Sequence, residues 1–294
     1  DVYKRQGHYD VLSYIVKEGK KRNIPSCLIT FDPNPFYVLS NKPESINLQS
    51  LDEKLKTLNE IGLDIVLIIP FDKEFSLMPA QMFADTVLKD LFNPTLISVG
   101  TNHYFGHKKE GNFEFLKAFC SDNNIELHTP DMRKHMGSTI SSSLIRSLIL
   151  DGNSSKVYDY LGRFYGFNAT VVSGSNRGKK MNYPTANFIP TFENQLLPST
   201  GVYLTKVFLD GKSYFGMMNA GVRPTFNEKK FVMEVHILSD KFGHLYDKNF
   251  YIEFLDKIRD EKKFDSKELL IKQIEKDKKV CIELIDTFKE KYEI

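Results

Sequence analysis

The sequence has few cysteines, almost no net charge and no long apolar run, and each absence excludes a class of protein. Its three cysteines, Cys27, Cys120 and Cys281, are far apart and odd in number, which argues against a disulfide framework or a zinc site and fits a reducing cytoplasm. The formal net charge of +2 gives no indication of a nucleic-acid or anionic-membrane partner. No apolar run approaches the ~20 residues that span a bilayer, and no signal peptide is recognisable. We therefore expect a cytoplasmic protein with neither a nucleic-acid nor a membrane partner.

Short apolar runs alternate with helical patterns through the first half of the 294-residue chain. Helices are predicted at 9–22, 51–61, 81–91, 112–123 and 142–150, and strands at 26–31, 65–69, 95–99 and 126–129. The capping box Ser50…Glu53 marks the start of the second helix. Continuous Ile/Val/Leu strands separated by helices indicate a parallel sheet covered on both faces, of the kind that binds ligands at the carboxyl ends of its strands.

The periodicity changes after a predicted link at 151–162. Strands are predicted at 168–173, 202–209, 213–219, 231–238 and 250–255, without intervening helices. This spacing predicts a closed or nearly closed antiparallel barrel. A long final helix begins near Asp265, and its apolar stripe should pack on the barrel. The fold class is therefore α/β plus β, with domains at 1–152 and 160–294.

The loop at 174–187 has the composition of a nucleotide site. It contains two glycines and three basic residues, followed by Pro184-Thr185-Ala186-Asn187. Glycines and cations suit phosphate oxygens, and the oxygens of Thr185 and Asn187 are hard, neutral ligands that Mg²⁺ accepts beside phosphates. It is not a Walker loop. An ordinary turn is the alternative, since loops rich in Gly and Asn are common.

Glu234 is the best placed candidate for a catalytic base. In its predicted strand Met233, Val235 and Ile237 point to one face, whereas Glu234 and His236 point to the other. A kinase acting on an alcohol needs a carboxylate that accepts the hydroxyl proton. A solvent-exposed strand glutamate is the ordinary alternative. The segment at 219–225 is predicted to be a turn-rich connection, and Arg259, just after the last strand, could equally form a surface salt bridge.

Four segments, at 184–187, 219–225, 233–236 and 258–264, occur in an order and at separations that resemble riboflavin kinase. The resemblance implies a six-stranded barrel with a carboxy-terminal helix, in which the loop at 174–180 covers the phosphates of ATP. It implies that Thr185 and Asn187 hold Mg²⁺ and nucleotide, and that Glu234 is the base that activates the ribityl 5′-hydroxyl. The other residues implied to bind substrates are Gly174, Arg177, Gly178 and Lys179 for ATP, and Arg223 and Arg259 for the flavin.

Two helix starts in the first half are candidate phosphate sites. His8 lies at the start of the first predicted helix, where the helix dipole favours anions, although an exposed capping histidine is commoner. Ser141, Ser142 and Ser143 open the helix at 142–150 and can cap it. Arg146 shares a face with Ser142 and Ser143. Hydroxyls and a guanidinium on one face suit a pyrophosphate.

The segments at 30–35, 99–111 and 140–146 resemble the adenylyltransferase module of bifunctional bacterial riboflavin kinase/FAD synthetases, a nucleotidylyltransferase. This resemblance implies that His8, Asn102, Ser142, Ser143 and Arg146 bind the nucleotide or flavin, and that catalysis is mostly positioning and charge stabilisation. It implies ATP as co-substrate, Mg²⁺ as cofactor, and riboflavin, FMN and FAD as substrate and products.

The chain departs from that family at its start and at three polar positions. Lys4-Arg5-Gln6 precede Gly7-His8 where the family has an apolar strand, an acidic residue and a first histidine. Asn34, Tyr104 and Ser143 replace usual residues but keep polar character. We therefore predict a truncated or altered start with the first strand missing, and weak or no adenylyltransferase activity in this chain as written.

Two alternatives to a bifunctional enzyme stay open. One is a monofunctional riboflavin kinase whose degenerate first domain serves as a scaffold. The other is a non-catalytic flavin- or nucleotide-binding module. The sequence leaves the oligomeric state undecided.

Overall fold

The computed structural model describes residues 8–39, 47–100, 103–129, 134–135, 138–139, 141–173, 183–224, 229–239 and 248–292. The chain forms two compact units. The barrel unit comprises mainly Ser141–Ile294, and the α/β unit comprises mainly Arg5–Glu44 and Ser50–Ile140. The helix predicted at 142–150 thus packs within the barrel unit, and the predicted domain limits at 152 and 160 stay a prediction. No described helix is long and apolar enough to cross a membrane.

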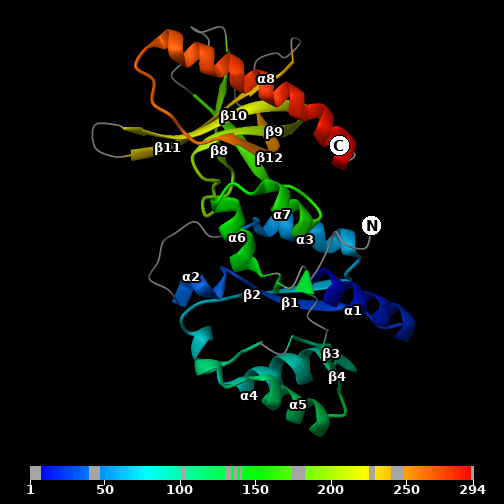
Figure 1. The fold of residues 1–294 in the computed structure, drawn as a ribbon. Coiled ribbons are helices and arrows are strands. Elements are labelled where there is room, and N and C mark those ends of the chain that lie inside the picture. Colours follow the sequence, from blue (N-terminus) through cyan, green and yellow to red (C-terminus); the bar gives the residue numbers. More distant parts are fainter. Residues whose placement is uncertain are drawn as a thin grey trace. The chain divides into compact units, whose positions relative to one another are not determined.

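Six strands of the barrel unit close into an antiparallel barrel, which confirms the predicted architecture (Figure 1). They are β7 (Tyr165–Val172), β8 (Ala186–Pro190), β9 (Gly201–Leu209), β10 (Lys212–Pro224), β11 (Lys229–Ile237) and β12 (Asn249–Arg259). Their order around the barrel is β10-β11-β8-β7-β12-β9. Closure pairs every strand on both sides and leaves no free edge.

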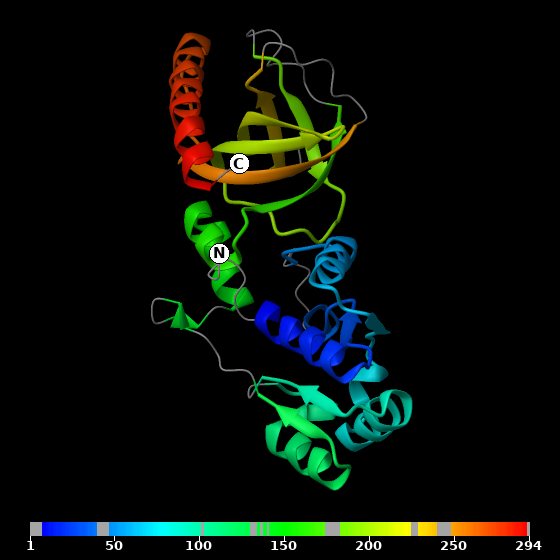
Figure 2. The same ribbon diagram turned by 90° about the vertical axis from the view of Figure 1, so that its right-hand side faces the viewer.

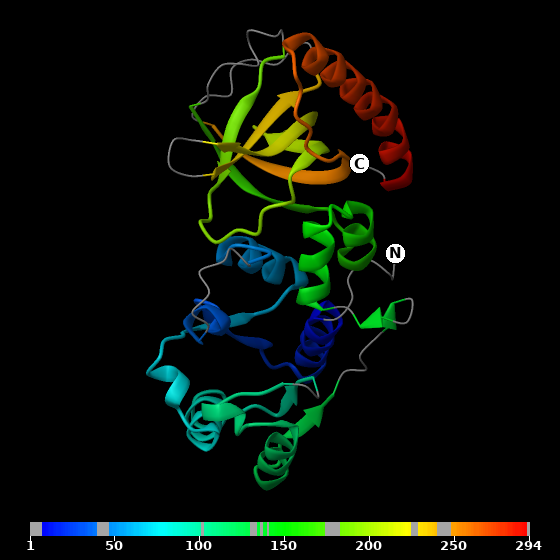
Figure 3. The same ribbon diagram turned by 60° about the vertical axis from the view of Figure 1, so that its left-hand side comes forward.

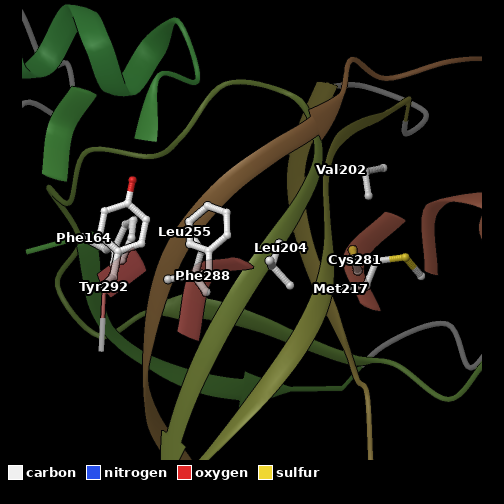
Figure 4. Packing of buried hydrophobic residues seen from close by; sticks show 8 residues of the cluster. All are labelled: Phe164, Val202, Leu204, Met217, Leu255, Cys281, Phe288 and Tyr292. Atoms are coloured by element: carbon white, nitrogen blue, oxygen red, sulfur yellow. The ribbon is translucent and has the colours of Figure 1, made fainter. Parts of the chain in front are cut away.

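The final helix α8 (Lys267–Tyr292) packs on the outside of the barrel (Figure 2). Its buried residues Cys281, Phe288 and Tyr292 join a cluster with Leu204 and Leu255 of the strands (Figure 4). The predicted apolar stripe is therefore confirmed.

Burial raises the pKa of the Cys281 thiol to about 12, which keeps it protonated and unreactive. All three cysteines are free thiols.

The predicted link at 151–162 is wrong in its centre, because a helix, α7 (Ser154–Leu161), occupies most of it. Gly162, in the left-handed conformation, ends this helix, as glycine often does. Val157 is fully buried, and the Tyr158 ring packs edge-on against Tyr292 of α8 at 4.3 Å between centroids. α7 and the preceding α6 (Ser142–Leu150) lie together at one end of the barrel (Figure 3).

A short segment from the first half of the chain also belongs to the barrel unit. Asn47 forms an isolated parallel bridge with Gln195, and the Gln195 side-chain amide donates to the carbonyls of Asn47 and Leu48 at 3.4 and 3.2 Å. Gln195 also donates to the Tyr165 hydroxyl at 2.7 Å. The Gln195 side chain is only 1% exposed, and a buried amide N–H needs hydrogen-bond acceptors within the protein.

The α/β unit contains the predicted helices and parallel strands, but the parallel strands form two separate pairs. Its helices are α1 (His8–Arg22), α2 (Pro35–Leu39), α3 (Leu51–Ile61), α4 (Ala80–Phe83) with the π-helix η2 (Ala84–Phe92), and α5 (Phe113–Asp122). Strand β1 (Cys27–Asp32) pairs with β2 (Ile65–Pro70), and β3 (Leu96–Ser98) pairs with β4 (Glu126–His128), both in parallel. A third, antiparallel pair joins β5 (Lys134–His135) to β6 (Ser138–Thr139). No strand among the described residues joins the two parallel pairs (Figure 1). The predicted parallel α/β architecture is therefore confirmed, although the described parallel strands form two pairs rather than one sheet.

Strand β10 also differs from the sequence-based expectation. The predicted turn-rich connection at 219–225 is strand as far as Pro224. Gly221 and Pro224 suggested a turn, but Gly221 pairs with Val232 within the β10–β11 ladder. Pro224 is at the end of the strand, where proline is tolerated.

Candidate active site

Three polar residues form a row across neighbouring strands on the outer face of the barrel. Glu234 of β11 lies directly opposite Asn187 of β8 on one side and Asn219 of β10 on the other. The residues that flank Glu234 in its strand, Met233 and Val235, are 2% and 1% exposed in the barrel interior, as the alternation predicted. Cβ atoms of directly opposed residues are about 5 Å apart, so the row brings a carboxylate and two amides together.

Thr185 joins this row from the segment that enters β8. Its hydroxyl Oγ1 donates to Glu234 Oε2 at 3.1 Å. Thr185 and Glu234 are partly buried, and Asn187 is 9% exposed. The three residues that the sequence predicted to act together therefore lie together, although they come from positions about 50 residues apart.

His236 was not predicted as a site residue, yet it holds the same segment. Its Nδ1 lies 2.8 Å from the carbonyl oxygen of Pro184, and its ring packs edge-on against Tyr183 at 5.5 Å between centroids. Burial lowers the pKa of His236 below its usual value; the Pro184 carbonyl raises it, and Lys278 of α8 lowers it. The sequence signal was its spacing of two from Glu234, which places both side chains on one face.

Arg259 lies at the end of β12 rather than in the following loop, and its guanidinium is engaged within the protein. Nε and Nη2 donate to the Asp277 carboxylate of α8 at 2.9 and 2.7 Å, and Nη1 donates to the Asp260 carbonyl at 2.9 Å. Asp277 is 3% exposed, so this bidentate pair is largely desolvated. Flavin binding by Arg259 stays a prediction.

Several predicted residues fall wholly or partly outside the described residues. Arg223 is a residue of strand β10, paired with Lys230 in the backbone register, and His8 is the first residue of α1; their side chains are not described. Those wholly outside the described residues are Gly174, Arg177, Gly178, Lys179 and Asn102.

The helix α6 presents its predicted residues at its amino terminus. The cap is Ser141, whose hydroxyl accepts from the Leu144 N–H at 3.2 Å, so capping does not account for Ser142 or Ser143. Both are exposed in the first turn, and Arg146 is partly buried one turn later. Binding of a pyrophosphate by Ser142, Ser143 and Arg146 stays a prediction.

A second polar group lies at the carboxyl end of β1 in the α/β unit. Lys54 of α3 donates through Nζ to the Thr30 hydroxyl at 2.5 Å. Burial lowers the pKa of Lys54, and nearby Asp32 raises it. Sequence reasoning missed Lys54 because a lysine in an exposed helical pattern is ordinarily solvated.

Comparison with known proteins covers nearly the whole chain. Residues 161–285 match the riboflavin kinase (flavokinase) family model and residues 5–144 match the FAD synthetase model. The bifunctional riboflavin kinase/FMN adenylyltransferase of Escherichia coli K12 is 32% identical over 92% of this chain and 86% of its own. The chain belongs to the bifunctional riboflavin kinase/FMN adenylyltransferase family.

Other relatives agree with this family. The enzyme of the same name from Buchnera aphidicola of Schizaphis graminum is 32% identical over 92% of this chain and 87% of its own. Among solved structures, a Streptococcus pneumoniae protein described as a macrolide-efflux protein is 28% identical, with a TM-score of 0.84 over 93% of this chain and 88% of that one. The fold of that solved structure therefore matches most of this chain.

Proposed function

We propose that the barrel unit transfers the γ-phosphoryl group of ATP to the ribityl 5′-hydroxyl of riboflavin, giving FMN and ADP. The observation that carries this proposal is the contact of Thr185 with Glu234, at 3.1 Å, beside the directly opposed Asn187. Membership of the riboflavin kinase family supports the choice of substrate.

In this proposal Glu234 accepts the proton of the 5′-hydroxyl as its oxygen forms the new bond to phosphorus. The bond from the γ-phosphorus to the bridging oxygen breaks, and ADP leaves. The hydrogen bond from the Thr185 hydroxyl to Oε2 of Glu234 orients the carboxylate toward the substrate hydroxyl. Positioning of this kind supplies much of the rate enhancement in phosphoryl transfer.

The residues of the row fit Mg²⁺ as a cofactor. Thr185 and Asn187 would hold it through a hydroxyl and an amide oxygen, ligands that Mg²⁺ accepts beside substrate phosphates. When bound, Mg²⁺ neutralises phosphate charge.

We further propose that the first half of the chain is the adenylyltransferase module, which joins FMN to the AMP part of ATP and releases pyrophosphate. Its match to the FAD synthetase model supports this, with His8, Asn102, Ser142, Ser143 and Arg146 as the proposed binding residues. We expect this second activity to be weaker than the kinase activity.

Incubation of the purified protein with riboflavin, ATP and Mg²⁺, followed by chromatographic separation of FMN and FAD, tests both proposals. We expect rapid FMN formation and slow or absent FAD formation. Absence of FMN would contradict the kinase proposal. Brisk conversion of added FMN to FAD would contradict the prediction of a weak adenylyltransferase, and a degenerate, scaffolding first domain predicts no FAD at any enzyme concentration.

A further inference from the structure

The backbone of Pro184 and Thr185, just before β8, takes no part in the strand pairing that positions Asn187 and Glu234. The described β8–β11 ladder ends at the pair Ala186↔Val235. Continued by its own register, it would place Thr185 opposite His236, but the backbone pairing stops one residue earlier. Pro184 has no N–H and offers only a carbonyl acceptor. The position of the Thr185 hydroxyl therefore depends on contacts other than the ladder.

Two side chains of β11 supply those contacts. Glu234 accepts from the Thr185 hydroxyl at 3.1 Å, and His236 meets the Pro184 carbonyl at 2.8 Å. The two side chains are two residues apart and thus project from the same face of the strand. One fixes the side chain of the segment and the other fixes its backbone, so the segment is held at two adjacent points.

In the contact between His236 and the Pro184 carbonyl, the histidine is the hydrogen-bond donor. A carbonyl oxygen only accepts, so Nδ1 of His236 carries the hydrogen. The Tyr183 ring packs edge-on against the imidazole and restricts its rotation. His236 thus supplies a fixed donor where the ladder has none.

We propose that His236 is a positioning residue of the kinase site. By holding the Pro184 carbonyl it places the Thr185 hydroxyl over Glu234, where the magnesium–nucleotide complex would bind. This inference rests on the proposed kinase function, but its geometric part concerns only residues 183–185 and 234–236.

Three substitutions at position 236 separate a positioning role from a merely structural one. In His236→Asn the amide N–H lies near the position of Nδ1, whereas in His236→Gln it lies near that of Nε2; His236→Ala has no donor. Binding of Mg·ADP, measured calorimetrically, should weaken about 10-fold in the alanine and glutamine variants, since one hydrogen bond is lost. The asparagine variant should stay within about 3-fold of the unsubstituted protein.

Binding of ADP in EDTA provides the internal control, and we expect it to change less than about 2-fold in all three variants, because Thr185 acts on the metal complex. His107→Ala is the matched control. It removes a similar contact, from His107 Nδ1 to the Ser76 carbonyl at 3.3 Å, from the α/β unit and should leave Mg·ADP binding by the barrel unchanged. Unchanged Mg·ADP binding in His236→Ala, or an equal loss in the asparagine variant, would overturn the proposal.

Long-range ¹H–¹⁵N NMR of the histidine side chains at pH 8, with His236 assigned by the asparagine variant, tests the geometry without any ligand. We expect the neutral Nδ1–H tautomer, and the Nε2–H tautomer would refute the contact with Pro184. If the protein forms no FMN, the proposed function fails, whereas the tautomer still decides whether His236 holds this segment.

Discussion

The barrel unit and the α/β unit place their candidate residues by different physical means. In the barrel, closure fixes the register of all six strands, and that register sets Glu234 opposite Asn187 and Asn219. In the α/β unit the described strands form only two-stranded sheets, and the predicted residue His8 lies at the start of α1, outside any strand ladder. Closed pairing thus positions a site through its backbone, whereas an open sheet leaves the site dependent on its loops.

Among the substitutions proposed here, Glu234→Gln should have the largest effect on activity, because it removes the proposed catalytic base of the barrel unit. Removing a general base typically lowers the rate by about 10²- to 10⁴-fold, so we expect that loss in kcat for FMN formation. The neutral amide keeps the shape, and binding of riboflavin and of ATP should be nearly unchanged.

Formation of FAD from added FMN provides the control, because the substitution lies outside the predicted adenylyltransferase residues. Steady-state kinetics with the two substrates give both rates. Retention of most FMN-forming activity in Glu234→Gln would contradict the assignment of the base.

Core truncations compare the stability of the two units. Leu204 is fully buried in the main barrel cluster, and Leu204→Ala should lower the free energy of unfolding of the barrel unit by about 4 kcal/mol. Leu58, 5% exposed, lies in a smaller cluster with Val16 and Leu63, and Leu58→Ala should cost about 2 kcal/mol because the site can collapse more readily. Urea unfolding followed by circular dichroism measures both, and a larger loss for Leu58→Ala would reverse the predicted order.

Thr185→Val keeps the shape of the side chain and removes its hydroxyl. Hydrogen bonds to charged groups contribute about 1.5–3 kcal/mol, so kcat/KM for FMN formation should fall about 10- to 100-fold, with a higher Mg²⁺ requirement. Thr170→Val is the matched control in the same barrel, since Thr170 donates to Asn249 Oδ1 at 2.7 Å on an exposed surface. Similar losses in both variants would argue against a special role for Thr185.

The smallest expected effect is on the pH dependence of the stability of the α/β unit. The Ser26 hydroxyl and N–H donate to Asp64 Oδ2 at 2.6 and 2.8 Å, and these bonds lower the pKa of Asp64. The stabilisation is therefore present above the unfolded-state pKa of about 4 and is lost as the pH falls through the lower folded-state pKa. Ser26→Ala should reduce stability at pH 7 more than at pH 2. An equal loss at both pH values, in urea titrations, would contradict this linkage.

Sequence patterns predicted most elements because the signals were local. The capping box of Ser50 and Glu53 begins α3 and the left-handed Gly62 ends it, so the helix has its predicted bounds. Alternation placed Met233 and Val235 in the barrel interior. Strand β8 was missed, since it is short and lies between Pro184 and Pro190. Helix α7 was not predicted within the link at 151–162, because α7 has few apolar residues and its burial depends on α8.

The pairing of site residues could be anticipated only through the family resemblance. Asn187 and Glu234 lie opposite each other through strand register, which a single sequence does not encode in any local pattern. The contact of His236 with Pro184 spans 52 residues and leaves no sequence signal beyond the spacing of two. The sequence predicts Arg259 in a loop because its partner, Asp277, lies in a helix for which the sequence predicts only packing on the barrel.

Paramagnetic broadening by Mn²⁺·ADP in ¹H–¹⁵N NMR tests the central claim most directly, since Mn²⁺ replaces Mg²⁺ at oxygen ligands. The claim is that the metal–nucleotide complex binds where Thr185, Asn187 and Glu234 meet. We predict that the amide signals of these three residues broaden at the lowest Mn²⁺·ADP concentrations, before those of Ser142 and Ser143. Broadening that begins at Ser142 and Ser143 and spares Thr185, Asn187 and Glu234 would contradict the account.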